Sequence, residues 1–187
     1  MDNSMVRSRS VHDVGEWSVA DATEVYDIER WGKGYFSIGE NGQVRVHPTK
    51  APERSIDLKQ LVDDLQRRGI NLPALIRFSD ILEHRLKDIH DAFQGAIAQN
   101  EYKGNYACIY PIKVNQQRQV IEEIAEFGKK YHYGLEAGSK PELIAALAHM
   151  HDPEAYIICN GYKDEEFIDL ALHSQKMGLK SMHVLEM

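Results

Sequence analysis

Lys113 stands near the end of an almost wholly apolar run, A-C-I-Y-P-I-K-V-N-Q-Q, at residues 107–117. Lysine side chains are rarely buried in full unless their charge is paired. Burial lowers the pKa of a lysine ammonium, and the neutral amine can form a Schiff base with an aldehyde cofactor or a carbonyl substrate. A strand that delivers one lysine to a site would suit this chemistry. The other interpretation is a strand-end lysine that reaches solvent, and the pattern alone favours it.

Three further polar residues follow apolar runs. Glu136, Asn160 and Glu186 continue from Lys113 with successive spacings of 23, 24 and 26 residues. Glu136 could hydrogen-bond the ammonium of Lys113 or a polar atom of a cofactor, but an acidic residue near a helix N-terminus needs no catalytic role. Asn160-Gly161 could offer backbone N–H groups to an anion, or form an ordinary loop. The nine histidines show no metal-ligand spacing.

A unit made of a strand, a loop and a helix recurs in the second half of the chain. Strands are predicted over 106–110, 131–135, 155–159 and 181–185, and helices over 117–130, from Ser139, and over 164–177. Ser139 and Glu142 have the spacing of a capping box, and Gly178 can end the last helix. Such units predict a parallel sheet, either doubly wound or part of a (β/α)8 barrel. In both folds the functional residues lie at the carboxyl ends of the strands.

The first half of the chain has a different pattern of residues and predicts different elements. Residues 1–30 are expected to form a polar tail and a short helix over 19–30. Two alternating runs within 35–48 flank Asn41-Gly42, which indicates a β-hairpin with a type I′ turn. A helix over 56–68, a short strand over 72–78 and a long helix capped by Ser79 should follow. The apolar face of that long helix consists of Ile81, Leu82, Leu86, Ile89, Phe93 and Ile97.

Composition narrows the function classes. The formal net charge of −7 argues against a nucleic-acid partner, which usually requires a basic surface. Cys108 and Cys159 lie in apolar runs and are expected to be buried free thiols. No apolar run suits a secretory signal or a membrane span, so a cytoplasmic protein without membrane partners is expected.

Three segments in order carry a resemblance to a known family. Y-P-I-K-V-N-Q at 110–116, G-L-E-A-G-S-K-P-E-L at 134–143 and I-C-N-G-Y-K-D at 158–164 resemble the biosynthetic arginine decarboxylases. These belong to the pyridoxal-phosphate decarboxylases with the alanine-racemase fold. The W-G-K-G-Y start at 31–35 and the hairpin after it are also similar, so the resemblance runs from 31 to 187.

The resemblance implies both a fold and an activity. The fold would be an α/β protein with a (β/α)8 barrel that binds pyridoxal phosphate, to which a second β domain is joined. Lys113 matches the lysine that forms the Schiff base with the cofactor, and Glu136 matches the acidic residue beside it. Ser139 and Glu142 match the helix start that follows. The implied reaction is decarboxylation of L-arginine to agmatine and CO₂, the first step of polyamine synthesis, in a homo-oligomer of at least two subunits. The family is also associated with magnesium.

The number of strand–loop–helix units is too small for a complete barrel. Four strands make about half of a barrel, because a closed one needs roughly 250 residues. The expected division is a tail and helix over 1–30, a hairpin of the second β domain over 31–50, and the first half of the barrel over 51–187. The residues for the cofactor phosphate, its ring nitrogen and the guanidinium are expected after 187. A chain of this length should therefore fold poorly and be inactive alone, with an open sheet edge at 181–187.

Two alternatives to arginine decarboxylation stay open. One is a related decarboxylase of ornithine, lysine or diaminopimelate. The other is a non-catalytic relic or binding module that keeps half of the barrel.

Overall fold

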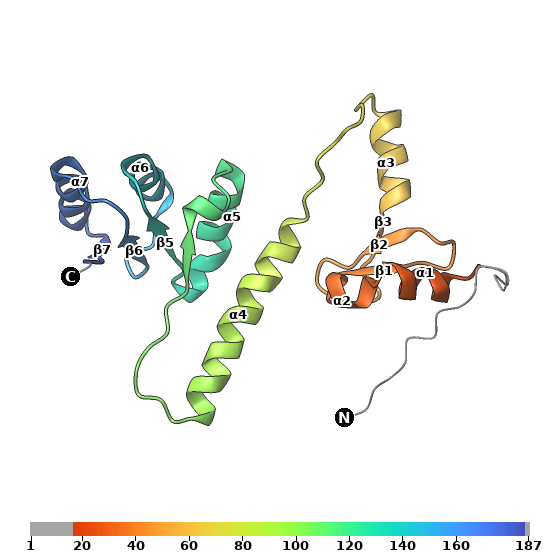
Figure 1. Ribbon diagram of the computed structural model, residues 1–187, viewed down its shortest axis with the longest axis horizontal. Helices are drawn as coiled ribbons and strands as arrows, with labels where there is room; N and C mark the ends of the chain where they lie inside the picture. The colour runs from red at the N-terminus through yellow and green to blue at the C-terminus, as the bar shows by residue number, and fades with distance from the viewer. Residues whose placement is uncertain (1–16, 186–187) are drawn as a thin grey trace. The chain divides into compact units, whose positions relative to one another are not determined.

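The computed structural model describes residues 17–185, which divide into two compact units between residues 77 and 78 (Figure 1). The domain boundary that was predicted between residues 50 and 51 lies earlier in the chain than this division. The predicted division into domains stays a prediction. The N-terminal unit keeps further residues with the hairpin because a third strand pairs with it and a helix follows that strand. None of the described helices is both long and apolar enough to cross a membrane.

The N-terminal unit is built around a small antiparallel sheet of order β1-β2-β3. Its elements are α1 (Val19–Val25), α2 (Ile28–Gly32), β1 (Phe36–Ile38), β2 (Val44–Val46), β3 (Ile56–Asp57) and α3 (Leu58–Arg67). The predicted hairpin is confirmed, with Phe36 opposite Val46. The predicted type I′ turn is wrong, because Gly42 has a positive φ of 74° but Asn41 does not. The connection is longer and is closed by the Gly39 N–H, which donates to the Gln43 carbonyl at 2.8 Å.

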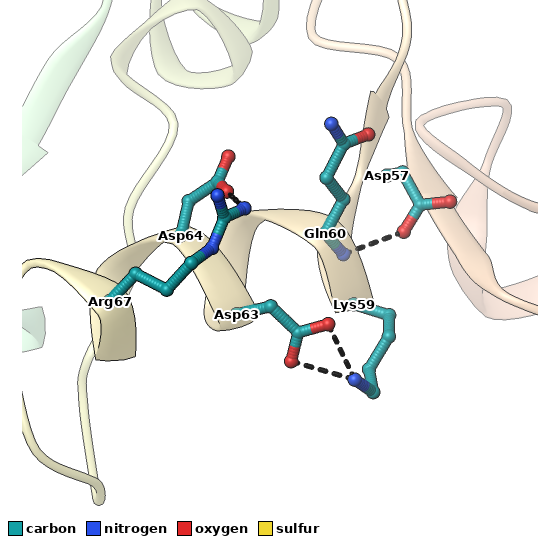
Figure 2. Close-up of polar contacts among 6 residues, drawn as sticks. All are labelled: Asp57, Lys59, Gln60, Asp63, Asp64 and Arg67. Atoms are coloured by element: carbon teal, nitrogen blue, oxygen red, sulfur yellow. Dashed lines mark hydrogen bonds and ion pairs between the residues drawn. The ribbon is translucent and has the colours of Figure 1, made fainter.

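The helix predicted over 56–68 is α3, and it begins two residues later because Ile56–Asp57 pairs with β2. Asp57 caps the helix, since its Oδ1 accepts a hydrogen bond from the Gln60 N–H at 3.0 Å (Figure 2). Two ion pairs join side chains one turn apart on the helix, Lys59 with Asp63 and Arg67 with Asp64 (Figure 2). Pairs of this exposed kind stabilise a helix by about 0.3–0.5 kcal/mol each.

Two other predictions for the first half need correction. The helix predicted over 19–30 is two helices, because Asp27 adopts a left-handed backbone conformation with φ of 50° between them. The strand predicted over 72–78 is irregular chain. Pro73 lacks the N–H that a ladder requires, and no strand among residues 17–185 pairs with this segment.

The second unit contains a parallel sheet of order β4-β5-β6-β7, which confirms the predicted parallel sheet. Its helices are α4 (Ser79–Gln99), α5 (Arg118–Gly128), α6 (Lys140–His149) and α7 (Glu165–Lys176), with the 3₁₀ turns η1 (Ile112–Val114) and η2 (Lys129–Tyr131). Its strands are β4 (Ile109–Pro111), β5 (Gly134–Ala137), β6 (Tyr156–Cys159) and β7 (Lys180–His183). Neighbouring strands in the sheet are consecutive along the chain. Each pair is joined by one helix, as strand–loop–helix units require.

The core lies between one face of this sheet and the row formed by α5, α6 and α7 (Figure 1). The register aligns Leu135 with Ile157, and Ala137 with Cys159, so these four side chains share a face, and none of them is exposed. The largest buried helix residue against them is Phe167. Alternation along the strands places Glu136 on the opposite face. Cys159 is a buried free thiol as predicted, and Cys108 is free and half-buried.

The long helix α4 covers α5 through specific contacts. Ser79 is its first residue rather than its cap, because Phe78 occupies the N-cap and the Ser79 hydroxyl donates to Glu123 Oε1 at 2.8 Å. The buried Tyr133 hydroxyl donates to the Leu86 carbonyl at 2.8 Å. These bonds tie α4 to the layer of helices on the core side of the sheet.

The end of α7 confirms the prediction for Gly178. This residue has φ of 88°, and its N–H donates to the Gln175 carbonyl at 3.0 Å. The Leu179 N–H donates to the Ser174 carbonyl at 3.2 Å, which completes a Schellman motif. Glycine is favoured at this position because it adopts positive φ without steric cost.

Asp152, which precedes β6, should make stability depend on acid pH. Burial alone would raise the pKa of this carboxyl, but the Glu154 N–H at 2.9 Å and His132 Nδ1 at 2.8 Å lower it overall. A depressed pKa contributes stability above the unfolded value of about 3.9 that is lost as the pH falls through the folded value. We expect Asp152→Asn to flatten the acid limb of a plot of unfolding free energy against pH. Asp169→Asn, an exposed control, should leave that limb unchanged, and equal slopes for wild type and Asp152→Asn would contradict the assignment.

Candidate active site

Lys113 lies in η1, two residues beyond the end of β4. Its neighbour Ile112 is 1% exposed and anchors the turn in the core, whereas the Lys113 side chain is exposed. Within residues 17–185 its ammonium forms no ion pair or hydrogen bond. The structure therefore places an unpaired amine at the carboxyl end of a parallel strand.

Glu136 is the third residue of β5 rather than a residue after the strand, and it is only 6% exposed. Its Cα is paired with Pro111 on one side and with Ile158 on the other. Oε1 accepts a hydrogen bond from Asn160 Nδ2 at 3.1 Å. Oε2 is buried and has no hydrogen-bond partner in the described part of the chain. A buried acceptor without a donor is costly, so this oxygen is suited to a donor that a ligand or a moving side chain brings.

Asn160 follows β6 directly, as predicted. Its backbone N–H donates to the Ala137 carbonyl at 2.9 Å, so this group is not available to an anion. Its side chain reaches Glu136 instead. Gly161 has φ of 72°, and a Cβ there would lie 2.2 Å from the Gly138 carbonyl oxygen. The loops after β5 and β6 therefore approach so closely that only glycine fits at position 161.

Glu142 ties the loops after β4 and β5 together. Ser139 caps α6 by accepting from the Glu142 N–H at 3.4 Å. The reciprocal bond of the predicted capping box is displaced by one residue, because Glu142 Oε2 accepts from the Gly138 N–H at 2.7 Å. Glu142 Oε1 accepts from Gln116 Nε2 at 3.0 Å. Sequence reasoning missed Gln116, whose only signal was its place three residues after Lys113.

The structure thus brings three of the four predicted residues to the carboxyl ends of adjacent parallel strands. Glu136 and Asn160 are in contact, and Lys113 belongs to the neighbouring strand end without pairing with Glu136. Glu186, the fourth, lies outside the described residues. A free amine after one strand, with a buried acceptor on the neighbouring strand, fits an aldehyde cofactor that also carries a polar donor. Residues 17–185 contain no group of three or more His, Cys, Asp or Glu side chains that could hold a metal ion.

Comparison with known proteins identifies a family and several relatives. Residues 83–187 match the family described as pyridoxal-dependent decarboxylase, pyridoxal binding domain. The chain is 50% identical over 171 residues to the biosynthetic arginine decarboxylase of Rhodopirellula baltica, covering 91% of this chain and 25% of that protein. It is also 50% identical over 171 residues to that of Gloeobacter violaceus, covering 91% of this chain and 27% of that protein.

A solved structure supports the fold. The crystal structure of the biosynthetic arginine decarboxylase from Campylobacter jejuni has a TM-score of 0.77 and 34% sequence identity, over 86% of this chain and 27% of that one. The alternating strands and helices, preceded by an antiparallel segment, are thus the arrangement of part of the barrel in such decarboxylases, as predicted. The chain spans about a quarter of the length of the relatives that it matches. Since the family match covers more than half of its residues, the chain belongs to the pyridoxal-dependent decarboxylases.

Proposed function

We propose that this chain forms part of the active site of a pyridoxal-phosphate-dependent arginine decarboxylase, which converts L-arginine to agmatine and CO₂. The observation that carries the proposal is the unpaired amine of Lys113 at the end of β4, next to the strand that holds the buried acceptor of Glu136. The relatives named biosynthetic arginine decarboxylase support arginine as the substrate.

Each residue has a defined task in this proposal. Lys113 Nζ would hold the cofactor covalently through its aldehyde group, with release of water, at the carboxyl ends of the strands. Lys113 Nζ would also be placed to accept and deliver a proton at the carboxyl end of β4. Glu136 Oε2 accepts a hydrogen bond from a donor of the cofactor or from Lys113. Pyridoxal phosphate, when bound, supplies the electron sink for the charge that remains on carbon as CO₂ leaves.

The test compares substrates in the protein at its full natural length. We expect CO₂ release and agmatine formation with L-arginine to exceed by at least about 100-fold the release with ornithine, lysine or diaminopimelate, because a site that hydrogen-bonds a polar group rejects analogues that lack it. Agmatine is measured by mass spectrometry and CO₂ by isotope release. A preference for another amino acid would favour the related decarboxylases. Absence of both turnover and cofactor binding would favour a non-catalytic module.

The pathway, the location and the oligomeric state are also proposals. Agmatine is a precursor of polyamines, so the reaction would be the first step of polyamine synthesis from arginine. The protein is proposed to work in the cytoplasm as a homo-oligomer of at least two subunits, without nucleic-acid or membrane partners. Light scattering at full natural length tests the oligomeric state.

A further inference from the structure

The two carboxylate oxygens of Glu136 have different surroundings. Oε1 takes the hydrogen bond from Asn160 Nδ2 at 3.1 Å, and Oε2 is buried with no donor in the described part of the chain. A carboxylate in the middle of a strand can rotate about its side-chain bonds, so the bond to one oxygen decides where the other points. Asn160 is the only described residue with a hydrogen bond to this carboxylate.

Asn160 is itself held firmly in place. Its N–H donates to the Ala137 carbonyl at 2.9 Å, which continues the pairing between β5 and β6 by one residue. The next residue, Gly161, packs against the Gly138 carbonyl so closely that a Cβ would lie 2.2 Å away. The Lys163 ammonium donates to the Gly161 carbonyl at 2.9 Å and closes the loop from the other side. The side-chain amide of Asn160 is therefore presented from a backbone that is fixed at several points.

We propose that Asn160 is a positioning residue that holds Glu136 by Oε1 and so directs Oε2 to the donor at the cofactor site. This inference rests on the proposed function, because it requires pyridoxal phosphate to bind at the carboxyl ends of β4 and β5. Asn160 does not touch the reacting atoms and acts through Glu136 alone. Its removal leaves Glu136 free to turn Oε2 away, and the loss appears as weaker cofactor binding.

A double-mutant cycle on cofactor affinity tests this inference. The dissociation constant of pyridoxal phosphate is measured by equilibrium dialysis on cofactor-free protein of full natural length, for wild type, Asn160→Ala, Glu136→Gln and the double variant. Glu136→Gln keeps the shape of the side chain but replaces one carboxylate oxygen by a donor. We expect Asn160→Ala to weaken binding by about 10-fold in the wild type and by less than about 2-fold in the Glu136→Gln background.

Further variants distinguish a specific role of the Asn160 amide from a general disturbance of the loop after β6. Asn100→Ala removes the same amide from the exposed end of α4, where Nδ2 donates to the Ala96 carbonyl, and should leave cofactor affinity unchanged. If Asn160→Ala does not fold, Asn160→Leu takes its place in the cycle, because it keeps the approximate size and loses the donor without adding a charge beside Glu136. Equal losses in both backgrounds, or no loss in the wild type, would overturn the inference.

The cycle also distinguishes the two proposals. Borohydride reduction followed by mass spectrometry reports whether Lys113 carries the cofactor in each variant. If the cofactor is attached at Lys113 but the losses of cofactor affinity in the Asn160 and Glu136 variants are additive, the positioning role of Asn160 is rejected. The proposed function then remains intact. Attachment at another lysine would remove the proposed function itself.

Discussion

Replacing Lys113 by alanine is expected to abolish covalent attachment of pyridoxal phosphate and to lower the decarboxylation rate by at least about 100-fold. In the proposed site this amine would bond to the cofactor aldehyde, and it would also be placed to accept and deliver a proton. The measurement is borohydride reduction of the protein at full natural length, followed by mass spectrometry of the peptide that contains position 113. Arginine-dependent CO₂ release is measured on the same samples.

The position of Lys113 makes this variant easy to interpret. Its side chain is exposed and pairs with no residue of the described range, so alanine should leave the midpoint of thermal unfolding unchanged. Lys176→Ala is the matched control, because Lys176 is an exposed lysine near the end of α7, far along the chain from the strand end. It should retain full attachment and turnover. Retained attachment in the Lys113→Ala protein would assign the cofactor to another lysine and reject the proposed site.

The fold of the second unit could be predicted from the sequence because each strand and helix is encoded locally. The positions of β4 and β5 could not. A strand was expected at 131–135, but β5 begins at Gly134, because Lys129–Tyr131 forms a 3₁₀ turn. A strand was also expected at 106–110, but pairing begins at Ile109, because the Tyr106 ring stacks on Phe93 of α4 with centroids 3.9 Å apart. Tyr106 thus fits the sequence pattern of a strand, but its ring packs against a helix. Where a strand begins depends on its contacts with residues elsewhere in the chain. The local sequence pattern does not contain these contacts.

The site shows the same limit. Spacing alone places Lys113, Glu136 and Asn160 after strands. The structure confirms this for Lys113 and Asn160, whereas Glu136 lies within β5. The bond between Asn160 and Glu136 could not be predicted, since it depends on the direction of two side chains on different strands. The capping box failed for a related reason: Glu142 turned to the Gly138 N–H, one residue before the expected partner. Sequence spacing gives the level of a residue in the sheet but not the contacts of its side chain.

Gly161→Ala is expected to destabilise the fold by about 3 kcal/mol and to weaken cofactor binding. The backbone at 161 has φ of 72°, which costs an alanine about 1–2 kcal/mol. A new Cβ would in addition lie 2.2 Å from the Gly138 carbonyl oxygen, and backbone cannot move aside as the end of a side chain can. The loop must therefore shift, and Asn160 shifts with it. Chemical denaturation reports the stability, and equilibrium dialysis of pyridoxal phosphate reports the binding.

Gly178→Ala separates the two causes of this loss. Gly178 has φ of 88°, but a Cβ there would meet nothing within 4 Å. This control should lose about 1 kcal/mol from conformation alone and bind the cofactor as the wild type does. The difference between the two variants then measures the close approach of the loops after β5 and β6. Equal effects of both variants on stability would show that the loops can separate without cost, and the rigid presentation of Asn160 to Glu136 would lose its physical basis.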